Sequence, residues 1–228
     1  SGNNVSGLQK VQVSIRDLTF PTTYYACSNA ACTTGNWVNS STGVWNDATG
    51  TNPWQLDQPD TIWTTNCNYR IQVQAIDNAR NTQTATTQAD IVFDTTAPTG
   101  QITSPVTQAG LNGYYRPAAL ATVQGTAADT PLGQVGSVKV NLKRQDNKYW
   151  DPASQTWGGG LVNISTSSWD GTVWKSTFPA TAWTDGTTYY LGIQVQDRAG
   201  NWMTAGSTNT FVVDMSSPVP SFSLPNAP

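Results

Sequence analysis

Histidine and glutamate are both missing from this chain, and charged residues make up only 11% of it. Without histidine, the chain lacks the side chain most often used for acid–base catalysis near neutral pH and for zinc coordination. No serine or cysteine stands beside a plausible base, and no glycine-rich phosphate loop is present. These absences predict that the chain is not an enzyme.

Basic clusters and long apolar runs are also missing. The net charge is −3 and the sequence pI is about 4.6, whereas a nucleic-acid surface needs clustered lysine and arginine to displace counterions from phosphates. No apolar run approaches the roughly 20 residues that a transmembrane helix requires. We therefore expect neither a nucleic-acid partner nor membrane insertion.

The residues that are abundant suit strands and turns. Threonine, valine, tyrosine and tryptophan fit a pleated surface, and aspartate, asparagine, glycine and proline fit turns, while alanine–glutamate–lysine helix patterns are scarce. This composition predicts an all-β chain with essentially no helix.

Two copies of one pattern lie 120 residues apart. In each copy an alternating segment is followed by a polar turn and then by an Asp-to-Pro element. These segments are 69–77, 78–81 and 94–98 in the first copy and 189–197, 198–201 and 214–218 in the second. Three tryptophans keep the same offset, Trp37, Trp54 and Trp63 matching Trp157, Trp174 and Trp183. A repeat of this kind predicts tandem domains of one fold.

Nearer the N-terminus the offset changes to 129, where residues 10–17 match residues 139–146. The first copy then carries about nine extra residues before Trp37. Cys27 and Cys32 fall within that insertion, which makes the cysteine loop an addition to one copy.

Alternating apolar residues mark the strands. Val11, Val13 and Ile15 alternate with polar residues, as do segments 69–75 and 191–195, which is the period of two expected for a strand with one buried face. Asp-Gly and Asn-Gly pairs supply the turns between them. About seven short strands in each 120-residue copy predict tandem immunoglobulin-like antiparallel β-sandwiches.

Several elements of the second copy resemble a known family. The segment 149–157, the Trp-Thr-Asp-Gly at 183–186, the Asp-Arg-Ala-Gly-Asn at 197–201 and a closing Asp-x-x-x-Pro resemble the bacterial Ig-like repeats of very large extracellular and surface proteins of the adhesin type. This resemblance implies an extracellular or cell-surface location, neighbouring repeats as partners, and a role as a structural spacer or filament segment.

The domain boundaries follow from the repeat. Residues 1–94 form a copy that lacks its first two strands and carries the cysteine insertion, residues 95–214 form a complete copy, and residues 215–228 form a linker and the first strand of a further repeat. Two interpretations of this phase stay open. The chain is an excerpt of a longer array, or Pro218, Phe222 and Leu224 donate a strand to the open edge of another copy, building a head-to-tail filament.

Acidic and amide side chains recur at the turns and are candidate calcium ligands. They are Asp77, Asn81 and Asp94 in the first copy and Asp197, Asn201 and Asp214 in the second. Calcium prefers such oxygen ligands, and the resemblance to adhesin arrays implies calcium at one pole of each sandwich. The alternative is that these side chains cap turns by bonding to the backbone.

All three cysteines lie in the first copy. Cys27 and Cys32 flank a four-residue loop and are expected to form a disulfide, with Cys67 as an alternative partner of either and three unpaired thiols as the other alternative.

Tryptophans without a counterpart in the other copy suggest a second function. Trp150 and Trp169 are interpreted as exposed planes able to stack on sugars. A carbohydrate-binding adhesin module with glycans as partners is therefore the alternative to a spacer.

Overall fold

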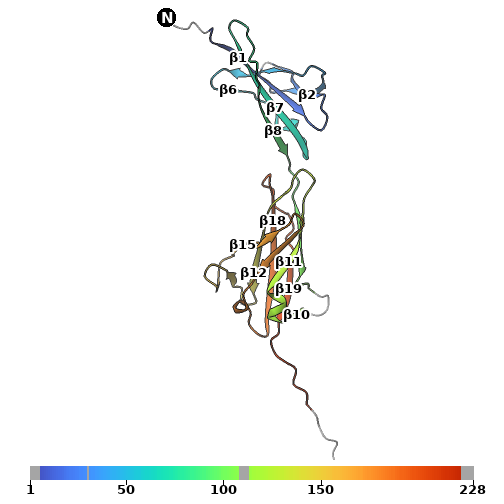
Figure 1. Ribbon diagram of the computed structural model, residues 1–228, viewed down its shortest axis with the longest axis vertical. Helices are drawn as coiled ribbons and strands as arrows, with labels where there is room; N and C mark the ends of the chain where they lie inside the picture. The colour runs from blue at the N-terminus through green and yellow to red at the C-terminus, as the bar shows by residue number, and fades with distance from the viewer. Residues whose placement is uncertain (1–5, 30, 108–112, 222–228) are drawn as a thin grey trace, which may run out of the picture. The chain divides into compact units, whose positions relative to one another are not determined.

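A computed structural model describes residues 6–29, 31–107 and 113–221 of the chain. It confirms the all-β fold class: strands dominate, and the described residues contain only short 3-10 turns as helical elements, which are η1 (Asp60–Ile62), η2 (Pro117–Leu120) and η3 (Ala180–Ala182). No helix in these ranges has the length and apolarity needed to cross a membrane. The chain divides into two compact units, residues 1–96 with 130–133, and residues 97–129 with 134–228 (Figure 1).

Unit 2 is a sandwich of two sheets. The larger sheet has the order β10-β19-β18-β12-β13-β14, with β15 also pairing with β12. Its strands are β10 (Gly113–Tyr115), β19 (Thr208–Val213), β18 (Thr187–Asp197), β12 (Val135–Arg144), β13 (Tyr149–Asp151), β14 (Thr156–Gly158) and β15 (Ile164–Ser165). The smaller sheet has the order β16-β17-β11-β9, with β16 (Ser168–Trp169), β17 (Val173–Thr177), β11 (Thr122–Ala128) and β9 (Thr99–Ser104).

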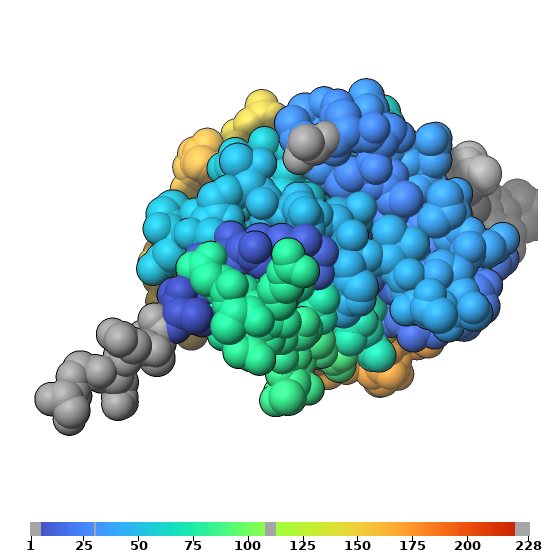
Figure 2. Space-filling model, turned by 90° about the horizontal axis from the view of Figure 1, so that it is seen from above, coloured from blue at the N-terminus to red at the C-terminus, as the bar shows by residue number. Residues whose placement is uncertain are grey.

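Unit 1 retains the larger of these two sheets. Its order is β3-β2-β1-β7-β8, with β4 also pairing with β1. The strands are β1 (Leu8–Asp17), β2 (Thr23–Cys27), β3 (Gly35–Asn39), β4 (Asn46–Asp47), β7 (Cys67–Asp77) and β8 (Thr87–Phe93). The start of β1 is fixed by the turn after β7, where the Asn78 amide donates to the Ser6 carbonyl at 2.7 Å; Figure 2 shows these segments side by side, in dark blue and green. The second sheet seen in the described part of unit 1 is two-stranded and consists of β5 (Thr49–Gly50) and β6 (Trp54–Gln55).

The central strand pairs of the two units have the same register. Val13 lies opposite Val73 in unit 1, and Val140 lies opposite Ile193 in unit 2. Both pairs also carry a register shift at one position, between Leu8 and Lys10 and between Val135 and Ser137. A shared bulge of this kind is a specific feature of a fold, because bulges bend and twist a strand at a defined point.

This register corrects the sequence alignment of the first strands. Val13 corresponds to Val140, an offset of 127 rather than 129. In the next hairpin Tyr25 pairs with Trp37, and Trp150 pairs with Trp157 in the same way. The offset is therefore 125 from Tyr25 to Trp150 and 120 from Trp37 to Trp157. The extra residues of unit 1 are therefore seven, split between two turns. The expected alignment was wrong by two residues, because a shift of two keeps the same side chains facing the core and the alternating pattern therefore fits both offsets.

The two units bury their sheets to different extents. In unit 2 the face of β12 and β18 is covered by the smaller sheet, and Val140, Leu191 and Trp174 are completely buried. In unit 1 no counterpart of β9 or β11 is found among the described residues, and Trp54, the counterpart of Trp174, is 41% exposed. Trp54 is therefore exposed although it repeats the position of a buried core residue, because the described part of unit 1 has no strands that cover it.

The core of unit 1 is correspondingly small. It is formed by Val13, Ile15, Tyr25, Cys32 and Ile62. The segment from β4 to η1, together with the cysteine hairpin, covers part of the sheet that β9, β11 and β17 cover in unit 2. The insertion thus contributes directly to the hydrophobic core of unit 1.

Candidate functional site

Each unit contains a tyrosine whose hydroxyl bonds to the turn that precedes its longest strand, β7 in unit 1 and β18 in unit 2. Tyr69 accepts a hydrogen bond from the Thr64 amide at 2.8 Å, and Tyr189 accepts one from the Thr184 amide at 2.8 Å. The second hydroxyl also donates to the Ala182 carbonyl at 3.3 Å. A tyrosine at the start of this strand that bonds to backbone a few residues upstream is the tyrosine corner of immunoglobulin-like sandwiches. Sequence analysis placed both tyrosines on strands but missed this contact.

Aromatic packing surrounds each of these tyrosines. The rings are Trp37, Tyr69 and Trp63 in unit 1 and Trp157, Tyr189 and Trp183 in unit 2. The tyrosine and the later tryptophan meet edge to face, with centroids 4.9 Å apart in unit 1 and 5.1 Å apart in unit 2. Such pairs stabilise a core by about 0.5–1.5 kcal/mol beyond the area they bury. The repeated residues therefore form the framework of the fold.

The predicted calcium ligands of the Asp-to-Asn turns bond to each other. The Asp77 carboxylate accepts from the amide nitrogen of Asn81 at 2.8 Å and from its side-chain nitrogen at 2.9 Å. Asp197 and Asn201 repeat both contacts at 2.8 and 2.7 Å. This is the turn-capping geometry that was the alternative to calcium.

Asp94 and Asp214 do not join these turns. Phe93 pairs with Cys67, the first residue of β7, so Asp94 follows at one end of that strand while Asp77 stands at the other, roughly 33 Å away along it. Val213 pairs with Thr187 in the same way and places Asp214 opposite the end that carries Asp197. The expectation that each trio meets at one pole is therefore wrong, because antiparallel pairing carries the last strand back to the opposite end.

Unit 2 holds a carboxylate that the sequence pattern did not indicate. One oxygen of Asp129, after β11, lies within 4.8 Å of one oxygen of Asp197. Asp197 is 4% exposed and Asp129 is half-buried, so the two carboxyl groups approach each other at a site with little contact with solvent. Asp129 has no counterpart in unit 1, and the repeat therefore gave no signal for it.

The turn after β7 differs between the units at one residue. Arg80 has φ of 68°, and Gly200, its counterpart, has φ of 99°. The left-handed region costs a residue other than glycine about 1–2 kcal/mol, although Arg80 still donates its amide to the Asp77 carbonyl at 2.9 Å. Arginine is therefore accommodated in the turn at a conformational cost.

Replacing Arg80 by glycine is expected to stabilise unit 1 by about 0.5–1 kcal/mol, the left-handed cost less the extra chain entropy of glycine. The reverse change, Gly200→Arg, should destabilise unit 2 although a Cβ there meets no neighbour. Calorimetry of the two variants measures both effects. A lower melting temperature for Arg80→Gly would show that the side chain itself stabilises the turn.

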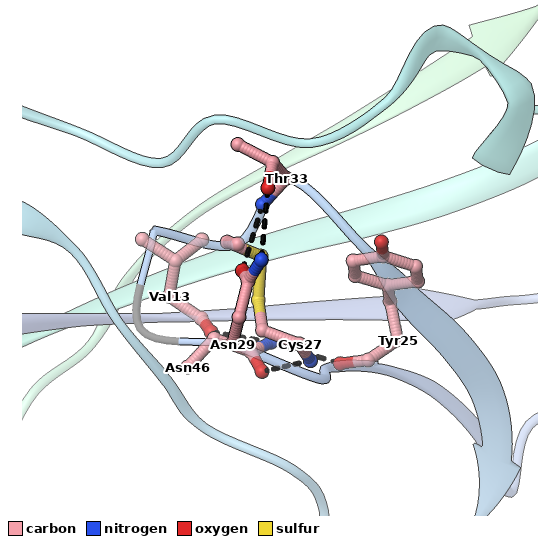
Figure 3. The surroundings of a disulfide bond; sticks show 7 residues. Val13, Tyr25, Cys27, Asn29, Thr33 and Asn46 are labelled. Carbon is pink, nitrogen blue, oxygen red and sulfur yellow. Dashed lines mark hydrogen bonds between the residues drawn. A yellow bond between two sulfur atoms is a disulfide. The ribbon is translucent and has the colours of Figure 1, made fainter.

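A disulfide joins Cys27 and Cys32 and closes the hairpin between β2 and β3 (Figure 3). The buried side chain of Asn46, which belongs to β4, also holds this hairpin. Its side-chain nitrogen donates to the Tyr25 carbonyl at 2.8 Å, and its side-chain oxygen accepts from the Cys27 backbone amide at 2.8 Å. Within the loop, Asn29 accepts from the Thr33 amide at 3.0 Å. Figure 3 shows these side chains converging on the disulfide.

Cys67 remains a free, half-buried thiol at the start of β7. The structure therefore does not contain the alternative disulfides in which Cys67 pairs with Cys27 or Cys32. Cys32 is 1% exposed, so the disulfide is part of the core of unit 1.

The two tryptophans proposed to bind sugars are not exposed planes. Trp150 is 1% exposed, and Trp169 is half-buried. The register explains the error, because Trp150 is the counterpart of the buried Tyr25. An open hollow of about 350 Å³ lies beside it, lined by Trp150, Pro152, Gln155, Thr177, Phe178 and Pro179. The tryptophan forms a wall of this hollow and offers almost no free surface.

The residues proposed as a strand donor fall at the edge of what the structure describes. Pro218 is exposed and lies outside any strand, and Phe222 and Leu224 lie outside the described residues. The described part of unit 1 does have an open strand edge. In the described part of unit 1, β8 is an edge strand paired with β7, and Val92 is 49% exposed, whereas its counterpart Val212 is 8% exposed beside β10.

Hydrogen bonds keep several carboxylates ionised. Bonding to Arg144 lowers the pKa of Asp146 to about 2, and bonding to Asn81 lowers the pKa of Asp77. A folded-state pKa below the ordinary value of 3.8 adds stability above that pH, and the added stability is lost as the pH falls through the folded pKa. The chain has no histidine, the side chain whose ordinary pKa lies between about 5 and 7.

Both thermal transitions should therefore stay constant from pH 7 to pH 5 and fall below about pH 4. Asp146→Asn should lessen the acid loss of unit 2 and leave unit 1 unchanged. Calorimetry across this range checks the expectation. A step in either melting temperature between pH 5 and 7 would show that some other group governs stability.

No protein-family model matches the chain, and a search of curated proteins finds no match. Solved structures do resemble it. The fibronectin(III)-like modules of Clostridium thermocellum CbhA align with 97% of this chain and 88% of their own, at 9% identity and a TM-score of 0.34. A tetra-tandem repeat from the extending region of a large adhesion protein aligns with 91% of this chain and 43% of its own, at 18% identity and a TM-score of 0.37.

A 1.5-MDa bacterial ice-binding adhesin aligns with 93% of this chain and 56% of its own, at 13% identity and a TM-score of 0.33. The chain thus spans less than two thirds of both adhesin structures. Bacterial fibronectin-III-like modules and repeat regions of large adhesins are thus among the solved structures that this chain resembles.

Proposed function

We propose that the chain is a structural spacer segment of an extracellular repeat protein. The observation that carries this proposal is the kind of residue that the two units share. The common features are framework contacts: the register of the central strands, the bulge, the tyrosine corner and the aromatic cluster. Repeats of one framework extend a protein by adding units. The disulfide of unit 1 fits an oxidising compartment outside the cytosol.

Replacing the chain by unrelated domains, called here the domain swap, tests this proposal. The chain would be placed between a surface anchor and a tip domain of known ligand, and then exchanged for two unrelated sandwiches of equal length. A spacer predicts that ligand capture at the tip is unchanged by the exchange. Loss of binding to cells or glycans in the exchanged protein, with the tip domain intact, would assign the activity to a surface of this chain, as the carbohydrate-binding alternative requires.

Polymerisation by strand complementation is a second, finer proposal. It is supported by the exposed edge and face of β8, whereas the counterpart of β8 in unit 2, β19, is paired along that edge with β10. Light scattering at increasing concentration should show self-association that is lost on deleting residues 216–228. The matched control is Val219→Ser, which alters an exposed residue of the tail outside the proposed contacts at Pro218, Phe222 and Leu224. A monomer at all concentrations would remove this proposal.

Calcium binding is also retained as a proposal, now with Asp129 beside the predicted ligand Asp197. Asp129 and Asp197 of unit 2 bring two carboxylate oxygens together, and a cation would offset their repulsion. Calorimetric titration of the chain with calcium chloride should give binding that Asp129→Asn abolishes. Asp214→Asn is the control, because Asp214 lies at the other end of the sandwich. Binding unchanged by Asp129→Asn would contradict this assignment.

A further inference from the structure

The second strand of unit 2, β10, and its last strand, β19, run side by side in the same direction. β10 pairs with β19 in parallel, with Gly113 opposite Phe211 and Tyr115 opposite Val213. Every other strand pair in the described residues is antiparallel. The amide of Asp214, just past β19, extends the contact by donating to the Tyr115 carbonyl at 3.0 Å.

Side chains add a second set of ties between the two ends of unit 2. The Asn209 amide of β19 donates to the Pro105 carbonyl at 2.7 Å and to the Ile102 carbonyl at 3.3 Å. The Thr107 hydroxyl accepts from the Thr210 amide at 2.7 Å and donates to the Thr210 carbonyl at 3.3 Å. These bonds fasten the segment that enters unit 2 to the strand that leaves it.

The entering segment is also fixed to β10. The Tyr115 hydroxyl accepts from the Val106 amide at 3.0 Å and donates to the Val106 carbonyl at 3.3 Å. The Tyr115 ring packs edge to face on Phe211 of β19, with centroids 5.9 Å apart. Phe211 is completely buried, so the ties lie over a packed aromatic contact.

The direction of the strands decides how this arrangement responds to tension. When the two ends of unit 2 are pulled apart, force enters at the N-terminal end of the first strands and leaves at the C-terminal end of β19. Because β10 and β19 are parallel, these points lie at opposite ends of the pair, and the force acts along the strands. All of the hydrogen bonds between them must then yield together. In an antiparallel hairpin pulled at its open end, they would break one at a time.

We infer that β10, β19 and the Asn209 and Thr107 ties form a shear clamp that makes unit 2 the mechanically strong unit of the chain. The inference rests on the proposed spacer function and adds to it a load-bearing element. Unit 1 provides an internal comparison. In its described residues the last strand, β8, pairs only with β7, and the counterpart of Asn209 is the exposed Ala89.

Single-molecule force spectroscopy of the full chain between identical handles tests the clamp. The two units are distinguished by length, since unfolding the strands of unit 1 releases about 300 Å of chain and unfolding those of unit 2 about 400 Å. The expected result is that the longer step occurs at the higher force. Equal forces, or a longer step at the lower force, would overturn the inference without any variant being made.

Variants then locate the strength. Thr107→Val with Asn209→Ala should shift the longer step to lower force and leave the shorter step unchanged. Thr177→Val, on the exposed end of β17 away from the first and last strands, is the matched control and should change neither. Thermal unfolding of each variant shows whether the sandwich remains folded at rest.

An unchanged force for the double variant would overturn the role of the ties. Should it fail to fold, Tyr115→Phe, which removes only the hydroxyl bonds to Val106, takes its place with the same expected shift and the same contradicting result. The spacer proposal is judged separately by the domain swap, because a chain with two weak units would still pass that test.

Discussion

Replacing Trp174 by alanine is expected to destabilise unit 2 by about 3–5 kcal/mol, whereas the corresponding change at Trp54 should destabilise unit 1 by about 1 kcal/mol. Trp174 is completely buried, and Gly125 of β11 leaves room for its ring, because a Cβ there would collide with the indole. Trp54 occupies the same position in the repeat but is 41% exposed. Comparing the two positions thus separates the stability that the tryptophan itself contributes from the stability that depends on the strands covering it.

Differential scanning calorimetry measures both changes in the full chain. For a unit of this size, Trp174→Ala should lower the corresponding melting temperature by roughly 10–20 °C, with the other transition unchanged. Hydrogen exchange of β18 and β7 assigns each transition to a unit. Equal losses at the two positions would mean that Trp54 is buried in solution and that unit 1 is covered by strands the structure does not place there.

Reduction of the Cys27–Cys32 disulfide is expected to destabilise unit 1 by about 2 kcal/mol, from the chain entropy that a loop of this length loses on closure. The loss falls on a small core to which Cys32 itself contributes. It should therefore lower the melting temperature of unit 1 by roughly 8–16 °C. Thermal unfolding with and without a phosphine reductant is the measurement.

Unit 2 is a built-in control for that experiment, because all three cysteines precede it. Its transition should not move on reduction. Cys67→Ser provides a second control: it removes the remaining thiol of unit 1 but leaves the disulfide intact. A transition of unit 1 that is unaffected by the reductant, with loss of the disulfide verified by mass, would show that the loop is held by Asn46 and packing alone.

The sequence was sufficient for the fold because its landmarks are core residues. Tyr69 and Tyr189 keep their spacing to the flanking tryptophans since these rings contact one another in both units. The alternation of Val11, Val13 and Ile15 likewise reflects a buried sheet face. Patterns of this kind record contacts made within one strand or one turn, and these are the contacts that a linear sequence displays.

The sites were harder to predict because they depend on which strand ends meet. Asp77 and Asp94 are near in sequence, yet an antiparallel strand separates them. Trp150 looked unmatched because an offset of 129 hid its correspondence with Tyr25. The parallel pairing of β10 joins segments about 100 residues apart through bonds such as that of Thr107 to Thr210. No short-range pattern reports a contact of that length.

Native-state hydrogen exchange tests the central claim, that the chain is two separate sandwiches built on one framework. The slowest amides should fall into two sets, one in Val11–Ile15 with Tyr69–Ala75 and one in Val138–Leu142 with Tyr189–Val195. Each set should open with its own free energy, because each pair of strands is the center of its own core. A single slow core that opens as one unit, or slow amides concentrated outside these strand pairs, would contradict the account.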